Sequence, residues 1–226
     1  MIRKNSIHSV APAKAGVHAF SLKIKSVGSG LRRNDAITHI LRSGGVGVLP
    51  TDTLYGIVGS ALKPKTVARI YRLRKRNPKK PMIILVASAA DTKKFGIAVD
   101  AKTKKILSKV WPGKVSVILR VSSRRRRMLK KFRYLHRGTG TLACRVPRPA
   151  WLRNLLKKTG PLIAPSANFE GQPPAPTISA ARKYFGKNVD FYADAGRLTS
   201  KPSTLIKIEK GEVIILRKGA RSLRAV

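Results

Sequence analysis

Acidic residues, cysteine and long apolar runs are scarce in this sequence, and each shortage narrows the possible classes of protein. Nine Asp and Glu stand against 49 Lys and Arg, which gives the 226 residues a formal net charge of +40. The single cysteine, Cys144, excludes an intramolecular disulfide and a cysteine-ligated metal site. No apolar run approaches the ~18 residues that a membrane-spanning helix needs. We therefore expect a protein of a reducing compartment, the cytoplasm, with no membrane partner.

Several catalytic signatures are also missing. The nine acids are scattered, and only Asp190 with Asp194 and Glu209 with Glu212 stand within four positions of each other, so no carboxylate cluster marks a two-metal site. The four histidines are dispersed, and neither H-E-x-x-H nor a histidine near G-x-S-x-G occurs. A G-x-x-x-x-G-K-[ST] phosphate loop is absent as well. The familiar signatures of hydrolases, metalloenzymes and P-loop nucleotidases are thereby excluded.

The excess of positive charge has two interpretations. It indicates a polyanionic partner such as RNA, or it reflects a preference for basic residues throughout the source organism. The densest run is SSRRRRMLKKFRYLHRG, residues 122–138, which carries eight Lys and Arg and no acid. We expect it to form a solvated loop or short helix, and it is the best local candidate for an RNA contact.

Apolar residues make up 42% of the chain, which is enough for a packed core. The pattern predicts a basic tail over 1–20 and one folded domain over 21–226. Strands and helices alternate, so the predicted class is α/β with a twisted mixed sheet and flanking helices. Strands are expected at 20–27, 46–50, 81–88, 114–121, 141–147, 161–168, 203–208 and 212–219, and helices at 36–44 (capped by Asp35), 64–76, 100–113, 150–160 and 177–186 (capped by Thr177).

Polar turns follow several predicted strands, namely LPTDT, ACRVP, IAPSAN and ILRKG. Ligands of open α/β sheets bind beyond strand ends, although a Ser or Thr there is more often a helix cap. Arg145 and Arg217 stand inside apolar stretches, where an unpaired guanidinium is costly to bury. Because acids are few, an anionic ligand carrying carboxylate or phosphate is the natural partner for these arginines.

A dense cationic segment, RLRKRNPKKPM, lies at residues 72–82 between a predicted helix and a predicted strand. It contains no glycine, so any phosphate bound here would be held by side chains. The alternative is a solvated basic helix end that the helix dipole stabilises.

These elements, in this order, resemble the YrdC-like threonylcarbamoyl-AMP synthases in their single-domain form. The resemblance covers about residues 40–220. It rests on GVGVLPTDTLYGIVG, IYRLRKRNPKKPMIIL, WPGKVSVIL, LACRVP, LIAPSANFEGQPP, STLI and ILRKGA. The pairing of P-T-D-T-x-Y-G with A-P-S-A-N at this separation is the specific part. The resemblance implies a twisted α/β sheet with a concave basic face.

The resemblance also implies an activity. Such enzymes make threonylcarbamoyl-AMP from L-threonine, bicarbonate or carbon dioxide, and ATP, and they release pyrophosphate. A separate transferase complex then moves the threonylcarbamoyl group to the adenosine beside the anticodon of tRNA. ATP acts as a substrate, and Mg²⁺ would arrive with the nucleotide, which is consistent with the missing carboxylate cage.

Site residues follow from the resemblance position by position. The threonine-binding set would be Thr53, Arg145, Ala164 and Ser203, and the ATP-binding set Arg76, Lys80, Thr141, Ser166, Pro174 and Arg217. Thr51 and Asp52 would shape the turn, Tyr55 would wall the pocket, and Asn168 would hold the second turn. No protein nucleophile is implied, so the catalytic candidates, Arg74 and Arg76, would act by positioning and electrostatics.

Three positions depart from the family pattern. Arg74 stands where lysine is usual, Glu170 where serine is usual, and Leu85 where many members carry histidine. Glu170 would point away from the nucleotide or pair with a nearby arginine. These departures keep a second hypothesis open, in which a divergent YrdC-like module binds RNA with little or no synthase activity. A carbamoyltransferase module is less favoured, because the extra domains that it requires are not present.

Overall fold

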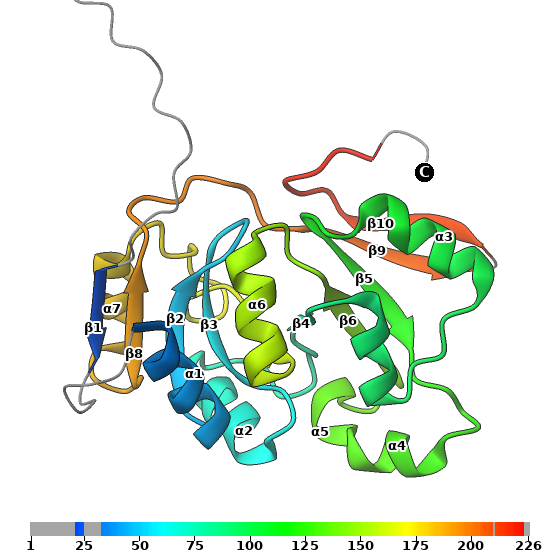
Figure 1. The fold of residues 1–226 in the computed structure, drawn as a ribbon, viewed down its shortest axis with the longest axis horizontal. Coiled ribbons are helices and arrows are strands. Elements are labelled where there is room, and N and C mark those ends of the chain that lie inside the picture. The colour runs from blue at the N-terminus through cyan, green and yellow to red at the C-terminus, as the bar shows by residue number, and fades with distance from the viewer. Residues whose placement is uncertain (1–20, 25–32, 210, 224–226) are drawn as a thin grey trace, which may run out of the picture.

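The structure is a computed structural model that describes residues 21–24, 33–209 and 211–223. Within these residues, ten strands form one mixed sheet in the order β1-β8-β2-β3-β7-β4-β6-β5-β9-β10 (Figure 1). The strands are β1 (Ser21–Ile24), β2 (Val46–Pro50), β3 (Tyr55–Ser60), β4 (Ile84–Leu85), β5 (Val115–Arg120), β6 (Thr141–Arg145), β7 (Leu162–Ile163), β8 (Phe191–Asp194), β9 (Thr204–Glu209) and β10 (Glu212–Arg217). The helices are α1 (Arg33–Ser43), α2 (Pro64–Leu73), the 3-10 helix η1 (Ala89–Phe95), α3 (Ala101–Val110), α4 (Arg126–Lys131), α5 (Arg133–His136), α6 (Ala150–Thr159) and α7 (Ile178–Phe185).

Two apolar clusters hold the layers together. Helices α1 and α6 cover one face of the central strands, where Leu41 and Leu152 pack with Leu85 and Leu162 (Figure 1). The larger cluster lies on the opposite face and receives side chains from α2, α3, α5 and α7. The central strands are therefore buried on both sides, which explains their nearly unbroken apolar sequences.

The sheet is strongly twisted, and this twist positions the site. By register, Arg145 lies beside Leu85, Leu85 beside Leu162, and Leu162 beside Ser60, so Arg145 is level with the far end of β3. Thr53 precedes the near end of that strand. A twist of about 20–25° between neighbouring strands accumulates across β3, β7, β4 and β6. Strand β5 is consequently oblique to β2 and β3 (Figure 1). Arg145 at the end of β6 nevertheless reaches the β2–β3 turn, where it contacts Thr53.

Most predicted elements are confirmed within one to three residues. Asp100 caps α3 by accepting a hydrogen bond from the Thr103 backbone at 2.6 Å, and Thr177 caps α7 through the Ala180 backbone at 3.2 Å. Segment 122–138 forms the two short helices α4 and α5. Asp35 was wrongly predicted as a cap, because it lies inside the first turn of α1.

Two predicted strands are much shorter than expected, and two observed strands were not predicted. The predicted strand 81–88 pairs only at Ile84–Leu85, and 161–168 only at Leu162–Ile163. Strands β3 and β8 were not predicted, since glycines interrupt the first and the second is only four residues long. The predicted tail, residues 1–20, lies outside the described residues. No helix of the described part is both long and apolar enough to cross a membrane.

Candidate functional site

A tight turn between β2 and β3 carries the three small polar residues of the P-T-D-T motif. Pro50 pairs with Tyr55, so the turn closes within four residues. The Thr51 hydroxyl donates to the Leu54 carbonyl at 2.7 Å and accepts from the Thr53 and Leu54 backbone amides at 3.2 and 3.3 Å. Thr51 therefore shapes the turn, as predicted. Its hydroxyl also lies 3.1 Å from that of Thr53, whose residue is buried.

Arg145 at the end of β6 is buried and meets this turn. Its Nη1 donates to the Thr53 hydroxyl at 3.2 Å and lies 3.4 Å from Asp52 Oδ1. Asp52 Oδ2 accepts from the Arg148 backbone at 3.1 Å. Arg145 therefore has an acidic partner within the protein, Asp52, in addition to the anionic ligand that the scarcity of acids predicted for it. Arg145 Nε is also buried and has no hydrogen-bond partner among the described residues.

A pair of hydroxyls and a second arginine lie near Arg145. Ser203, just before β9, shares a hydrogen bond of 2.9 Å with Ser116 of β5, and both residues are buried. The Ser203 carbonyl accepts from Arg217 Nη2 at 2.8 Å and from Arg217 Nε at 3.3 Å. Burial is the main cause that lowers the pKa of Arg145, and repulsion by Arg217 lowers it further, while Asp52 opposes the shift. The shared influence on the Arg145 pKa shows that the two guanidinium groups are close enough to repel each other.

The predicted burial of Arg217 is wrong. Strand β10 is the last of the sheet, so Arg217 is exposed. Its guanidinium is held in place by hydrogen bonds to the Ser203 carbonyl. Partial desolvation lowers its pKa. The expected role of Tyr55 as a wall of the pocket stays a prediction. Its hydroxyl donates to the Gly196 carbonyl at 2.7 Å and to Asp194 at 3.1 Å, so it fastens β3 to the segment after β8.

The turn after β7 lies beside the P-T-D-T turn. Ser166 pairs with Gly56 as an isolated bridge, and the Ala167 amide donates to the Tyr55 carbonyl at 2.8 Å. Ala164 is buried, and its amide donates to the Ile83 carbonyl at 2.9 Å. These contacts place A-P-S-A-N next to the hairpin turn, which the separation of about 110 residues in sequence could not establish.

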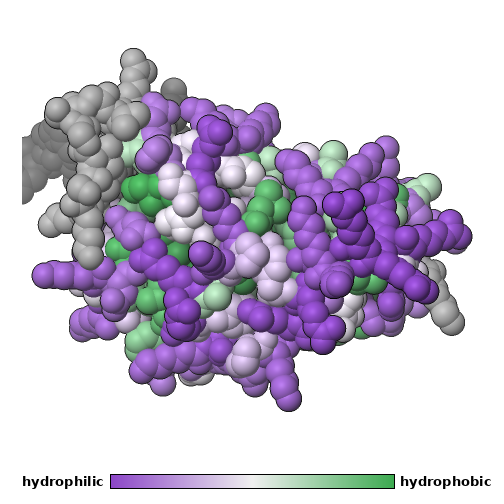
Figure 2. Space-filling view, turned by 90° about the horizontal axis from the view of Figure 1, so that it is seen from below, coloured by the Kyte–Doolittle hydropathy of each residue, from purple (hydrophilic) through white to green (hydrophobic). Residues whose placement is uncertain are grey.

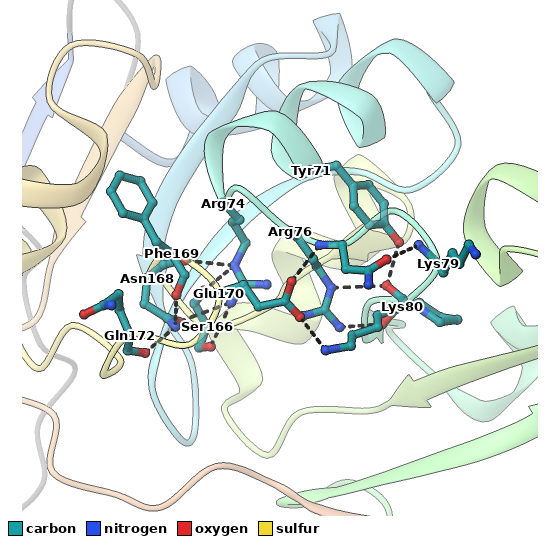
Figure 3. A network of polar contacts seen from close by, with 12 residues as sticks. Tyr71, Arg74, Arg76, Lys79, Lys80, Ser166, Asn168, Phe169, Glu170 and Gln172 are labelled. Carbon is teal, nitrogen blue, oxygen red and sulfur yellow. Dashed lines mark hydrogen bonds and ion pairs between the residues drawn. The ribbon is translucent and has the colours of Figure 1, made fainter.

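Arg74 is buried beneath this second turn. Its Nε donates to the Ser166 carbonyl at 3.0 Å and the Asn168 carbonyl at 3.1 Å, and its Nη2 reaches the Asn168 side chain at 3.3 Å (Figure 3). Asn168 Nδ2 in turn donates to the Phe169 and Gln172 carbonyls at 2.7 Å, so it holds the turn as predicted. Arg74 Nη1 is buried without a partner in the described residues. Desolvation, reinforced by repulsion from Arg76, lowers the pKa of Arg74 to about 10.

Glu170 pairs with the cationic segment rather than pointing away. Its carboxylate lies 3.1 Å from Lys80 Nζ and 3.7 Å from Arg76 Nη1, and it accepts from the Asn77 backbone at 2.6 Å (Figure 3). Hydrogen bonding by the Asn77 amide is the main cause of the lowered pKa of Glu170. Arg76 also donates to the Lys80 and Pro81 carbonyls at 3.1 and 3.0 Å. The segment is therefore a folded loop with fixed side chains.

Among the described residues, Thr141 and Pro174 form no hydrogen bond with the residues around Arg145 or with those around Arg74. Thr141, at the other end of β6 from Arg145, lines a cavity of about 600 Å³ with residues of β5, β9 and β10, among them Arg120, Lys207 and Glu212. Pro174 is half-buried, and the amide of its neighbour Ala175 donates to the Ala167 carbonyl at 3.2 Å. The described residues contain no group of three or more His, Cys, Asp or Glu that could hold a metal ion.

Two groups of candidate site residues thus lie on neighbouring turns. The first contains Thr53, Arg145 and Ser203, and the second contains Arg74 and Ser166. The profile of the Sua5/YciO/YrdC family, described as "Telomere recombination", matches residues 39–219. All the predicted site residues, from Thr53 to Arg217, lie within that match.

The chain belongs to the Sua5/YciO/YrdC family. It is 31% identical over 183 residues to a threonylcarbamoyl-AMP synthase of Laribacter hongkongensis, covering 81% of this chain and 95% of the relative. Its fold matches P. abyssi Sua5 complexed with L-threonine, with a TM-score of 0.73 and 25% identity, over 82% of this chain. The chain spans 54% of that structure. E. coli YciO shares the fold with a TM-score of 0.70, over 84% of this chain and 89% of YciO.

The sequence did not point to two residues that the structure places in this candidate site. Ser116 was not singled out, although the alternation of KVSVILRV places it on the same face as Ile118 and Arg120. Asp52 was given a role in the turn only, and its contact with Arg145 depends on sheet twist. Leu85 is fully buried beside Arg145 in the register of β4 and β6, so the position offers an apolar wall and no polar contact.

Proposed function

We propose that this protein is a threonylcarbamoyl-AMP synthase that uses L-threonine, bicarbonate or carbon dioxide, and ATP. One observation carries the proposal. The buried Nε of Arg145 has no hydrogen-bond partner in the part of the chain that the structure describes, although its neighbouring Nη1 is already fixed by Thr53 and Asp52. A buried donor without an acceptor costs about 1–3 kcal/mol, which a bound carboxylate recovers. The identity with named synthases over most of both chains supports the same activity.

Threonine would bind at the first group. Its carboxylate would take the free Nε and the remaining face of the Arg145 guanidinium, a geometry suited to a planar carboxylate. The Thr53 hydroxyl and the Ser203–Ser116 pair would contact the polar end of the substrate, and Ala164 would line its side chain. Asp52 keeps Arg145 in place when the pocket is empty, so little reorganisation is needed upon binding.

ATP would bind at the second group. Arg74 offers a buried Nη1 that has no partner among the described residues. Arg76 is held by the Lys80 and Pro81 carbonyls, and Lys80 pairs with Glu170. Ser166 adds a hydroxyl between the two groups, while Pro174, Thr141 and Arg217 would contact other parts of the nucleotide. Mg²⁺ would be held mainly by the phosphates, because the acidic side chain in this group, Glu170, is already committed to Lys80 and Arg76.

The reaction requires no protein nucleophile. The threonine nitrogen adds to carbon dioxide and loses a proton to solvent, which gives a carbamate. A carbamate oxygen then attacks the α-phosphorus of ATP, and the bond to pyrophosphate breaks. The residues of the site hold two anions against each other, and the guanidinium groups of Arg74 and Arg76 stabilise the charge that develops.

The product would pass to a separate transferase complex that modifies tRNA beside the anticodon. Such a role places the protein in the cytoplasm, with tRNA or another RNA as a partner. The net charge of +40 supports contact with a polyanion.

The decisive experiment is pyrophosphate release by the purified full chain. Release from ATP is expected only when both threonine and bicarbonate are present, and omission of either should reduce it to background. Serine in place of threonine is the matched control for the side-chain pocket. An absence of release, together with salt-sensitive RNA binding, would replace this proposal by the alternative of a divergent RNA-binding module.

A further inference from the structure

We propose that strand β10 is an interface between two copies of this chain, which pair their edge strands antiparallel into one continuous sheet. Strand β10 (Glu212–Arg217) is the last of the sheet, and within the described residues it pairs with β9 alone (Figure 1). Its outer edge therefore presents backbone N–H and C=O groups to which no other described strand is bonded. Such an edge is a template for the addition of a further strand.

The side chains along this edge are apolar and exposed, which is unusual on so polar a surface. The face seen from below in Figure 2 is mostly hydrophilic, and apolar residues show there only in small patches. Three consecutive residues of β10, Ile214, Ile215 and Leu216, are exposed by 40%, 41% and 50%. Edge strands are commonly protected by lysine or proline, and β10 contains neither.

The two faces of β10 determine the register of the pairing. Glu212 and Ile214 face the cavity that Thr141 also lines, whereas Val213 and Ile215 face the other side, in register with Ile208 and Ile206 of β9. A two-fold axis perpendicular to the sheet leaves both faces unchanged, so residues opposite each other must share a face. An axis at Ile214 meets this condition. It places Ile214 opposite its own equivalent and Val213 opposite Ile215 of the second copy.

A bulge in β10 brings the charged ends of the strand into the same register. The pairing with β9 shifts at Leu216, which is an extra residue in β10. With the axis at Ile214, Leu216 and Arg217 together lie opposite Glu212 of the second copy. Glu212 forms no ion pair within the described residues. Arg217 donates to the Ser203 carbonyl through Nε and Nη2, and its Nη1 can therefore serve the opposite carboxylate.

A second copy fits this edge better than an acidic protein does. Glu212 would repel an acidic strand, whereas a second copy supplies Arg217 at that position. The long-range charge acts in the other direction, because two chains of +40 each repel one another. Added salt screens this repulsion and leaves the apolar contacts intact. Self-association should therefore strengthen with salt, while the binding of an acidic protein would weaken.

The pairing also extends one wall of the cavity beside β10. Glu212 and Ile214 line this cavity of about 600 Å³ together with Thr141 and Arg120. Because the axis leaves the faces unchanged, Glu212 and Ile214 of the second copy continue the same wall across the interface. This consequence, unlike the interface itself, rests on the proposed function, in which Thr141 contacts the nucleotide.

Sedimentation velocity of the full-length, RNA-free protein tests the interface over a range of protein concentrations, at about 0.1 M and about 0.5 M sodium chloride. Ile214→Lys places two ammonium groups opposite each other at the axis. Leu62→Lys is the matched control, because it adds the same charge at an exposed apolar residue outside β10. The wild type and Leu62→Lys should form a dimer whose affinity rises with salt, and Ile214→Lys should weaken that dimer at least about tenfold. Circular dichroism checks that each variant is folded.

Cysteine cross-linking tests the register. Opposite Cβ atoms of an antiparallel pair lie about 4.5–5.5 Å apart, so Ile214→Cys should form an intermolecular disulfide upon mild oxidation. Ile215→Cys is equally exposed but lies opposite Val213, so it should cross-link much more slowly, and the native Cys144 is buried.

Three outcomes would each overturn the proposal: a monomer under all conditions, equal weakening by both lysine variants, or equal cross-linking of both cysteine variants. Neither measurement involves ATP. A failure of the interface is therefore distinguishable from a failure of the proposed synthase activity.

Discussion

At the scale of single residues, the site is organised around buried arginines that are only partly satisfied. Within residues 21–24, 33–209 and 211–223, Arg145 and Arg74 each have one buried donor without a partner, while other donors of the same guanidinium are fixed. The hydrogen bonds that are made hold the arginine side chain in place, and the remaining N–H group can donate to a ligand. This is how a chain with nine acids can keep two guanidinium groups inside the protein.

Substitution of Arg145 tests its assignment to threonine. Arg145→Ala should raise the KM for threonine at least about tenfold and the KM for ATP much less, because only the carboxylate contact is lost. The matched variant Arg74→Gln should show the opposite pattern, with the larger effect on ATP. Since Arg145→Ala leaves Asp52 buried and unpaired, a stability loss of up to about 3–5 kcal/mol is expected. The double variant with Asp52→Asn should recover part of that stability, and equal effects of Arg145→Ala on both KM values would contradict the assignment.

The lowered pKa of Glu170 predicts that the stability of the protein depends on pH. Its folded-state pKa lies below the ordinary value of 4.5, so the contribution of its contacts is fully present above that value and is lost as pH falls through the lower, folded pKa. Between about pH 6 and about pH 3.5, the free energy of unfolding measured in urea should therefore fall less in Glu170→Gln than in the wild type. Identical losses in both proteins would mean that Glu170 does not contribute to acid sensitivity.

At the scale of elements, the β2–β3 hairpin and the turn after β7 together carry most of the site. Their positions depend on close packing of β2 against β8. Gly47 has Phe191 directly against it, since an added Cβ would lie 2.1 Å from the Phe191 ring. The backbone can approach this closely only because the position has no side chain.

Gly47→Ala should therefore destabilise the protein by about 1–3 kcal/mol, because Phe191 must move. The measurement is the midpoint of urea or thermal unfolding. Gly56→Ala in the neighbouring strand is the control, since an added Cβ there would meet its nearest atom at an ordinary 3.4 Å. A similar loss in both variants would indicate a general glycine effect instead of the clash with Phe191.

At the scale of the whole molecule, the net positive charge is the main electrostatic influence on stability. Forty uncompensated positive charges repel one another in the compact state, and added salt screens that repulsion. The melting temperature of RNA-free protein should therefore rise between about 0.05 M and about 0.5 M sodium chloride, since the Debye length falls across this range. Calorimetry checks this directly. A falling melting temperature would show that the attractive pairs, such as Arg69–Asp190 at 2.7 Å, outweigh the repulsion.

The family, the α/β class and most helices could be predicted from the sequence, because motif order, apolar periodicity and the cap Thr177 act over short distances along the chain. The tertiary structure alone decided the strand order, the ion pair between Asp52 and Arg145, the pairing of Glu170 with Lys80, and the exposure of Arg217. Each of these depends on which strands are neighbours and on how far the sheet twists between them. Such long-range geometry brings together residues about 90 positions apart, and no local pattern in the sequence encodes it.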